Sequence, residues 1–154
     1  MAAKTDLQDA LESVFQRPIR HLSRSPSAYS SSFSLEELEV IFEDGKSLPV
    51  IFKNLSFDAM LSDGRKAKPD FLYAPDREIQ VYRSILVPLG AGTPLMYGAT
   101  VEAKLNRYWL FLEKVNGHAL YEIGDFEIWL EVVRWLARFQ SCSSSDARAA
   151  VPQL

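Results

Sequence analysis

The sequence has 154 residues, a formal charge of −3 and a hydrophobic fraction of 47%, with 12% aromatic residues. That composition over that length is sufficient for one domain with a buried core. A nucleic-acid partner requires clustered basic residues to neutralise phosphates, so the acidic balance argues against nucleic acid. No run of about 18 apolar residues occurs, so the sequence predicts no membrane partner.

Cysteine and histidine are scarce in this chain. Cys142 is the single cysteine, and His21 and His118 are the two histidines. A lone cysteine forms no internal disulfide, and this set contains no recognisable zinc site. The first fifteen or so residues lack the apolar stretch of a signal peptide. We therefore expect a cytoplasmic protein without metal ligands of its own.

The first segment, residues 1–18, is predicted to be an N-terminal helix. Thr5 and Gln8 have the spacing of a capping box. Apolar residues then recur at helical intervals, at Leu7, Ala10, Leu11, Val14 and Phe15. Pro18 predicts the end of the helix.

Three strands are predicted next, at residues 19–22, 35–42 and 48–55. A serine-rich stretch, 23–34, separates the first two and is expected to be a mobile loop. Asp44 and Gly45 mark a tight turn before the third strand returns antiparallel. Glu37 and Glu39 alternate with apolar residues, so we expect them on a solvated strand face.

The third strand carries a lysine in an apolar setting. Ile51 and Lys53 alternate with Val50 and Phe52, so both faces of the strand are largely apolar. Such a strand belongs in the interior of a sheet, and Lys53 is then expected to point into a pocket. The alternative is a lysine at a strand end that reaches solvent.

A short helix at residues 76–86 is predicted to supply the partner of this lysine. Pro75 suits the first helical position, after an irregular stretch at 57–74. Val81, Tyr82 and Ile85 follow Glu78 at helical spacing, which places Glu78 on the packed side. Burial of either charge alone is costly, so Lys53 and Glu78 are expected to pair. The alternative is an unrelated surface glutamate.

Two strands and a long helix complete the prediction. The strands are expected at 95–101 and 107–115, and the helix from Asp125 to about Phe139. Ile128 and Trp135 add a second apolar stripe to this helix, which predicts a protein partner or self-association through it. Residues 141–154 are predicted to be a flexible tail. The predicted fold is α+β, a twisted antiparallel sheet of about five strands with a packed helix.

This order of elements resembles the small lobe of the aminoglycoside-phosphotransferase-like branch of the protein-kinase fold. The likeness covers roughly residues 19–139, with the nucleotide-binding small lobe at 19–117 and a connecting segment and helix at 118–140. The local features that carry it are Val50-Ile51-Phe52-Lys53, Glu78 near a helix start, Tyr97-Gly98, and Leu110-Phe111-Leu112-Glu113 before Gly117.

The resemblance implies a bound nucleotide, ATP or GTP. Lys53 would contact the α- and β-phosphates, and Glu78 would orient Lys53. The serine-rich loop, with Ser30 and Ser31, would face the phosphates. The backbone of Glu113 and Val115 would meet the purine edge. The apolar slot would be lined by Ile51, Leu110 and Leu112.

The sequence also departs from that family. It lacks the glycine-rich loop G-x-G-x-x-G, and it contains no H-x-D-x-x-x-x-N catalytic loop and no D-F-G. The resemblance therefore implies a truncated part of a phosphotransferase, inactive alone, with no catalytic residue in this chain. Magnesium and a small-molecule acceptor are expected only with a complete second lobe. The alternative is a kinase-derived interaction module without catalysis.

Overall fold

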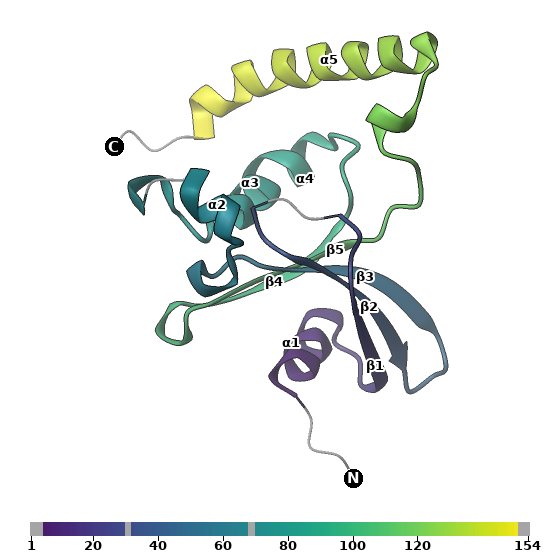
Figure 1. Cartoon of the computed structure of the whole chain (residues 1–154), viewed down its shortest axis with the longest axis vertical. Coiled ribbons are helices and arrows are strands. Elements are labelled where there is room, and N and C mark those ends of the chain that lie inside the picture. The colour runs from purple at the N-terminus through teal and green to yellow at the C-terminus, as the bar shows by residue number, and fades with distance from the viewer. Residues whose placement is uncertain (1–4, 30–31, 68–69, 151–154) are drawn as a thin grey trace. The chain divides into compact units, whose positions relative to one another are not determined.

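The computed structural model describes residues 5–29, 32–67 and 70–150, drawn in Figure 1. The chain divides into two compact units. The first unit comprises Met1–Ile79 and Pro94–Lys114, and the second comprises Gln80–Thr93 and Val115–Leu154. Each unit is described by itself.

A five-stranded antiparallel sheet forms the first unit, so the α+β prediction is confirmed. The strands are β1 Ile19–Pro26, β2 Leu35–Phe42, β3 Ser47–Asn54, β4 Met96–Glu102 and β5 Arg107–Glu113. Their order across the sheet is β1-β2-β3-β5-β4. Strand β3 lies between β2 and β5, so it is an interior strand, as its apolar sequence predicts.

Strand β1 extends further than predicted. The sequence favoured a loop from residue 23, yet Ser23 to Pro26 pair with Glu39 to Glu36 on β2. Serine has little strand propensity, but β1 is an edge strand and needs only backbone pairing on one side. Pro26 is tolerated at the end of such a strand because an edge strand leaves some N–H groups unpaired.

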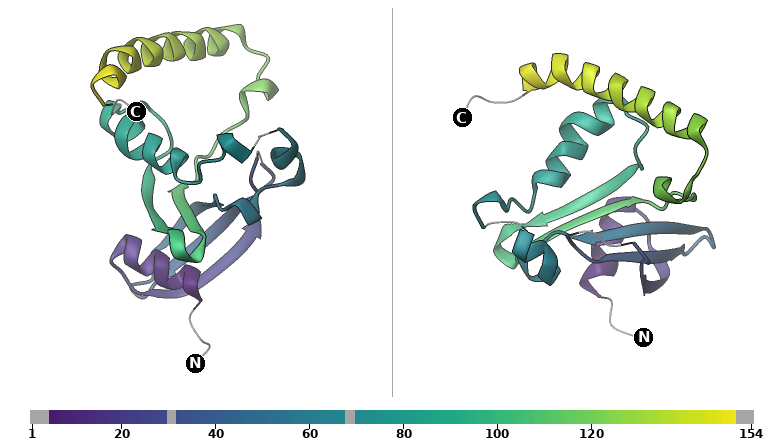
Figure 2. Two further views of the ribbon diagram at one scale, coloured as in Figure 1. Left: turned by 90° about the vertical axis from the view of Figure 1, so that its left-hand side faces the viewer. Right: turned by 45° about the horizontal axis from the view of Figure 1, so that its top comes forward.

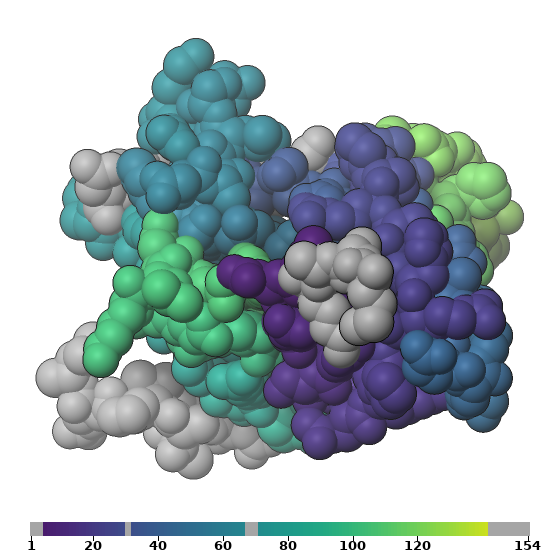
Figure 3. Space-filling model, turned by 90° about the horizontal axis from the view of Figure 1, so that it is seen from below, coloured from purple at the N-terminus to yellow at the C-terminus, as the bar shows by residue number. Residues whose placement is uncertain are grey.

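Helix α1, Asp6–Phe15, packs on one face of the sheet (Figure 2). Thr5 caps it, since its side chain accepts a hydrogen bond from the backbone N–H of Gln8. The helix buries its apolar stripe against the strands. Fully buried side chains there are Leu11 of the helix and Val40, Val50 and Phe111 of the sheet. In Figure 3, α1 and the turn between β4 and β5 lie side by side, where Asp6 and Arg107 form an ion pair.

The stretch after β3 is more regular than predicted. It contains 3-10 turns at Phe57–Ala59 and Asp70–Leu72, and helix α2 at Ser62–Ala67. Helix α2 contains Gly64, where a Cβ atom would lie 2.7 Å from the carbonyl oxygen of Ser32. Only glycine permits this close approach of the two backbone segments.

The middle helix is interrupted by a π-helical turn. It runs as α3 Arg77–Val81, a π segment Tyr82–Leu86, and α4 Val87–Leu89. Ile79 is fully buried and belongs to the first unit, as does Glu78. Further 3-10 turns lie at Ala103–Leu105 and Leu120–Glu122.

Helix α5, Phe126–Ala150, belongs to the second unit and is longer than predicted. The sequence favoured an end near Phe139 and a tail from residue 141, because serines follow one another there. No glycine or proline interrupts residues 126–150, however, and serine costs a helix only a few tenths of a kcal/mol per residue. The Ser141 hydroxyl donates to the carbonyl of Ala137 at 2.8 Å, one turn back along the helix.

In the ranges 5–29, 32–67 and 70–150, no helix combines the length and the apolar content needed to cross a bilayer.

Candidate functional site

Lys53 and Glu78 meet in the first unit, as the sequence predicted. The Lys53 ammonium donates to both carboxylate oxygens of Glu78, at 2.9 Å and 2.8 Å. The lysine side chain is 14% exposed and the glutamate side chain 36%. The two opposite charges offset part of each other's cost of removal from water beside an apolar sheet.

The fold fixes both partners. Lys53 lies opposite Leu35 of β2 and opposite Leu110 of β5. Glu78 lies in the first turn of α3, next to the fully buried Ile79. A hydrogen bond holds the chain before α3 next to the end of β3: the Tyr73 hydroxyl donates to the Leu55 carbonyl at 2.8 Å. Burial raises the pKa of this hydroxyl, which therefore stays a donor at neutral pH.

Phe33, near the end of the serine-rich segment, also lies close to Lys53. The Lys53 nitrogen lies 5.9 Å from the ring centroid of Phe33, within the range of a cation–π contact. Phe33 is buried and forms a β-bridge with Met60, and the Ser32 carbonyl accepts from the N–H of Leu61 at 3.0 Å. Ser30 and Ser31, which the sequence placed over the phosphates, lie outside the described residues.

A second ion pair lies on the same face of the sheet. The Lys114 ammonium donates to Glu37 at 2.6 Å, and the side chains are 36% and 27% exposed. Glu37 is opposite Ile51 in the register, so it lies on the same face as Lys53. Its other oxygen accepts from the Ser27 hydroxyl at 3.2 Å. The hydrogen bond from Lys114 lowers the pKa of the Glu37 carboxyl, with a smaller contribution from Ser27.

Alternation predicted Glu37 and Glu39 on a solvated face; Glu39 is exposed, and Glu37 is partly exposed but shares its face with Lys53 and pairs with Lys114, which alternation did not predict. Alternation alone tells which residues share a face, not what covers that face. The position of Glu37 on the face of Lys53 could have been predicted from the Asp44–Gly45 turn. Counting back from this turn pairs Glu37 with Ile51, which has the parity of Lys53.

Apolar side chains separate the two ion pairs. Ile51 pairs with Leu112 and Lys53 with Leu110, so Leu110 and Leu112 flank β3 on this side. Both leucines are buried, and Ile51 is half-buried. We call the strand side chains on this side the Lys53 face: Glu37, Ile51, Lys53, Leu110, Leu112 and Lys114. It carries ion-paired cations at two positions, with the half-buried Ile51 between them.

The residues expected at the purine edge are only partly available. The backbone N–H of Glu113 donates to the Leu95 carbonyl at 2.8 Å, and the Glu113 carboxylate accepts from the N–H of Leu95 at 3.0 Å. Both groups are used by the pairing of β5 with the start of β4, so this N–H does not meet a purine. Val115 belongs to the second unit and is exposed.

A cavity of about 280 Å³ lies on the α1 side of the sheet. Arg24 lines it and donates twice to Glu36, at 2.8 Å each, and this contact raises the pKa of the guanidinium. The remaining lining residues are Thr5, Asp6, Leu7, Phe52, Asn54 and Trp109. Arg24 and Glu36 pair with each other in this cavity, so neither charge is left for a ligand.

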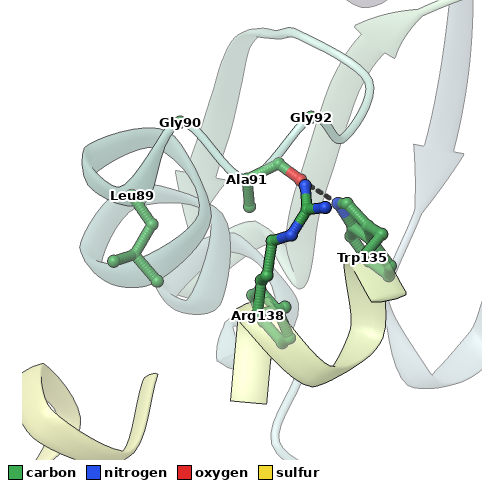
Figure 4. A pocket seen from close by; sticks show the side chains of 7 residues that line it. Leu89, Gly90, Ala91, Gly92, Trp135 and Arg138 are labelled. Carbon is green, nitrogen blue, oxygen red and sulfur yellow. Dashed lines mark hydrogen bonds between the residues drawn. The ribbon is translucent and has the colours of Figure 1, made fainter. Parts of the chain in front are cut away.

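The second unit contains a cavity of about 250 Å³ between the turn at residues 89–92 and α5 (Figure 4). Trp135 donates its indole N–H to the Ala91 carbonyl at 2.8 Å and stacks on Phe139, with ring centroids 5.6 Å apart. Arg138 extends from α5 along the same cavity. Trp135 thus has partners within its own unit, while 41% of its surface stays exposed.

The Lys53 face is the better candidate for binding chemistry, because charged groups there are partly withdrawn from solvent beside an apolar surface. Among the described residues, no group of three or more His, Cys, Asp or Glu could hold a metal ion. No protein-family model, no curated protein and no solved structure matches this chain.

Proposed function

We propose that the Lys53 face binds the phosphates of a purine nucleotide, ATP or GTP. Lys53 is the phosphate ligand and Glu78 is the residue that orients it. In this proposal the first unit is the kinase-like small lobe of a phosphotransferase similar to the aminoglycoside-phosphotransferase-like family. The observation that carries the proposal is the double contact between the Lys53 ammonium and the Glu78 carboxylate.

The energetics of this pair support a binding role. Removing a lysine from water costs free energy that an ion pair recovers only in part, so an apolar residue in a sheet interior gives similar or better stability. An ammonium has three N–H donors, and two point to Glu78. Among the described residues Glu78 is the hydrogen-bond acceptor of this ammonium, so a third N–H can donate to a phosphate oxygen, for which a lysine supplies a point charge.

The surroundings of Lys53 suit a nucleotide. Ile51 is a half-buried apolar side chain next to the ammonium, against which a base and ribose can pack, while Leu110 and Leu112 are buried beside it. A helix that follows β3 supplies the carboxylate that holds the lysine, as the resemblance implies. The phosphates are therefore proposed at Lys53, with the base toward Ile51.

Catalysis is not assigned to residues of this chain. Phosphoryl transfer needs a group to orient the attacking hydroxyl and ligands for magnesium, and the sequence contains neither H-x-D-x-x-x-x-N nor D-F-G. In the proposed phosphotransferase these groups, and the pocket for a small-molecule acceptor with a hydroxyl, come from a second lobe. The role proposed for this chain is nucleotide binding.

The test is the thermal stability of the protein with millimolar magnesium ATP or magnesium GTP. A ligand that binds only the folded state raises the melting temperature. We expect this rise in the wild type and in Lys66→Ala, because Lys66 is an exposed lysine of the same unit. Lys53→Ala should abolish the rise. An equal rise in Lys53→Ala would remove Lys53 from the site, and no rise in the wild type would contradict the proposal.

Helix α5 favours a second candidate, a protein-interaction module. Exposed apolar side chains occur along this helix at Phe126, Ile128, Trp129, Val133, Trp135 and Leu136. Val133→Glu should then weaken self-association or partner binding without changing the response to nucleotide. Sedimentation of the wild type as a dimer, and of this variant as a monomer, would support self-association. A monomeric wild type would leave only binding to another protein.

A further inference from the structure

We infer that Glu37 and Lys114 make the site prefer guanine over adenine nucleotides. The inference rests on the proposed function, because it concerns the base end of the same site. It follows from the second ion pair on the Lys53 face, in which Lys114 contacts one carboxylate oxygen of Glu37 and Ser27 contacts the other.

The register puts this ion pair where the base belongs. Ile51 precedes Lys53 by two residues, which is about 7 Å along a strand. Glu37 lies directly opposite Ile51, and Lys114 reaches the same carboxylate from the end of β5. With the phosphates on Lys53, a ribose and one phosphate separate the base from the ammonium. The base then reaches Ile51 and the neighbouring Glu37.

Guanine is complementary to a carboxylate and an ammonium placed side by side. Its N1–H and 2-amino group are adjacent donors that suit the two oxygens of one carboxylate, and its O6 is an acceptor that suits a lysine. An ionised carboxylate offers about four lone-pair sites, and Lys114 and Ser27 use two of them. The base therefore binds without displacing either partner of Glu37.

Adenine fits the same pair less well. On the corresponding edge it has one donor, the 6-amino group, and one acceptor, N1. Adenine donates at most one hydrogen bond to Glu37, where guanine donates two. The lone pair of adenine N1 then faces the carboxylate and is repelled by it. A buried or half-buried group left without its partner costs free energy, so a site built for two donors discriminates against a base that offers one.

A purely structural role explains the pair poorly. Ion pairs as exposed as this one contribute little to stability. A carboxylate on the face that holds the phosphates also repels them, and Lys114 offsets that charge. The pKa of Glu37 is lowered, so the carboxylate is ionised at neutral pH and accepts hydrogen bonds only.

The experiment compares dissociation constants for magnesium GTP, ATP and xanthosine triphosphate by calorimetry on the full 154-residue chain. The wild type should bind GTP about tenfold or more tightly than ATP. Glu37→Gln should prefer xanthosine triphosphate over GTP, because the amide accepts from N1–H and donates to the 2-oxo group. Glu39→Gln is the matched control, an exposed glutamate on the same face and strand, and should keep the wild-type order.

The outcomes separate this inference from the proposed function. Lys53→Met should weaken the binding of all three nucleotides and leave their order unchanged. Equal affinities for GTP and ATP, with Lys53 still required, would overturn the inference and leave the phosphate site standing. A Glu37→Gln variant that retains the wild-type order would also overturn it. If none of the nucleotides binds the wild type at millimolar concentration, both proposals fail.

Discussion

The two faces of the sheet in the first unit are built from the same strands but differ in chemistry. The α1 face is closed by a helix and is apolar at its centre, where Leu11, Val40 and Phe111 are fully buried. Charged side chains at its margins pair with each other, as Arg24 does with Glu36 and Arg107 with Asp6 of α1. The Lys53 face instead carries two ion pairs beside buried leucines.

This difference separates stability from binding. Apolar burial stabilises a fold by about 25 cal/mol per Å², whereas half-exposed ion pairs contribute about 1 kcal/mol or less. The α1 face is therefore expected to hold the first unit together, and the Lys53 face to carry the chemistry. Substitutions on the α1 face should therefore lower stability more than nucleotide binding. Substitutions on the Lys53 face should lower nucleotide binding more than stability.

The largest loss of stability is expected from Phe111→Ala. Phe111 is fully buried on the α1 face and stacks on Phe52, with ring centroids 5.6 Å apart. Removing the ring should lower the free energy of unfolding by about 3–5 kcal/mol, because a cavity is left in a packed core. Urea denaturation measures this. A loss below about 1 kcal/mol would show that the α1 face is not the stabilising core.

A smaller loss is expected from Gly98→Val. A Cβ atom at Gly98 would lie 2.7 Å from a methyl group of Val14 on α1, so a larger side chain must displace the helix. Overpacking of this kind costs about 1–3 kcal/mol. Val14→Ala should recover part of the loss in the double variant, as measured by urea denaturation. If the two losses simply add, α1 does not dock through this contact.

On the Lys53 face, Lys53→Met should cost about 1 kcal/mol, because the partly exposed Glu78 regains water once its partner is removed. The double variant Lys53→Met with Glu78→Leu should be nearly as stable as the wild type. Both variants should lose the melting-temperature response to magnesium GTP. A loss of 3 kcal/mol or so in the single variant would assign the pair a structural role instead.

The smallest effect concerns the pH dependence of the second ion pair. Lys114 lowers the pKa of the Glu37 carboxyl, so the unfolded chain binds this proton more tightly than the folded protein. The stabilisation is complete at pH values above the pKa of a glutamate in the unfolded chain, about 4.3. It is lost as the pH falls through the lower pKa of Glu37 in the folded protein.

The stability difference between the wild type and Lys114→Met should thus be about 1 kcal/mol or less at pH 7 and should disappear in acid. Urea denaturation across this pH range checks it. A difference that grows as the pH falls would have the wrong sign and would contradict the contact.

The sequence predicted most of the first unit, because periodicity reports directly on which side chains are buried. The helix from Thr5, the strands around Val40 and Phe52, and the meeting of Lys53 with Glu78 are confirmed. The end of β1 at Pro26 was missed, since edge pairing by the backbone leaves no apolar pattern.

The candidate site was predicted less completely, because its second ion pair joins residues far apart in the sequence. Lys114 follows Glu37 by 77 positions, and the contact exists only because β5 is inserted beside β3. No local pattern specifies that strand order. The hydrogen bond from the Glu113 N–H to the Leu95 carbonyl was not predicted for a similar reason, since it also joins segments that are apart in the sequence.

The most direct test of phosphate binding at Lys53 is an NMR titration of the protein, labelled with 13C-lysine, with magnesium GTP. The ε-methylene resonance of Lys53 should shift in a saturable manner, while that of the exposed Lys66 stays in place. A Lys53 resonance that stays unchanged up to millimolar nucleotide, or that moves no more than the resonance of Lys66, would contradict the phosphate site.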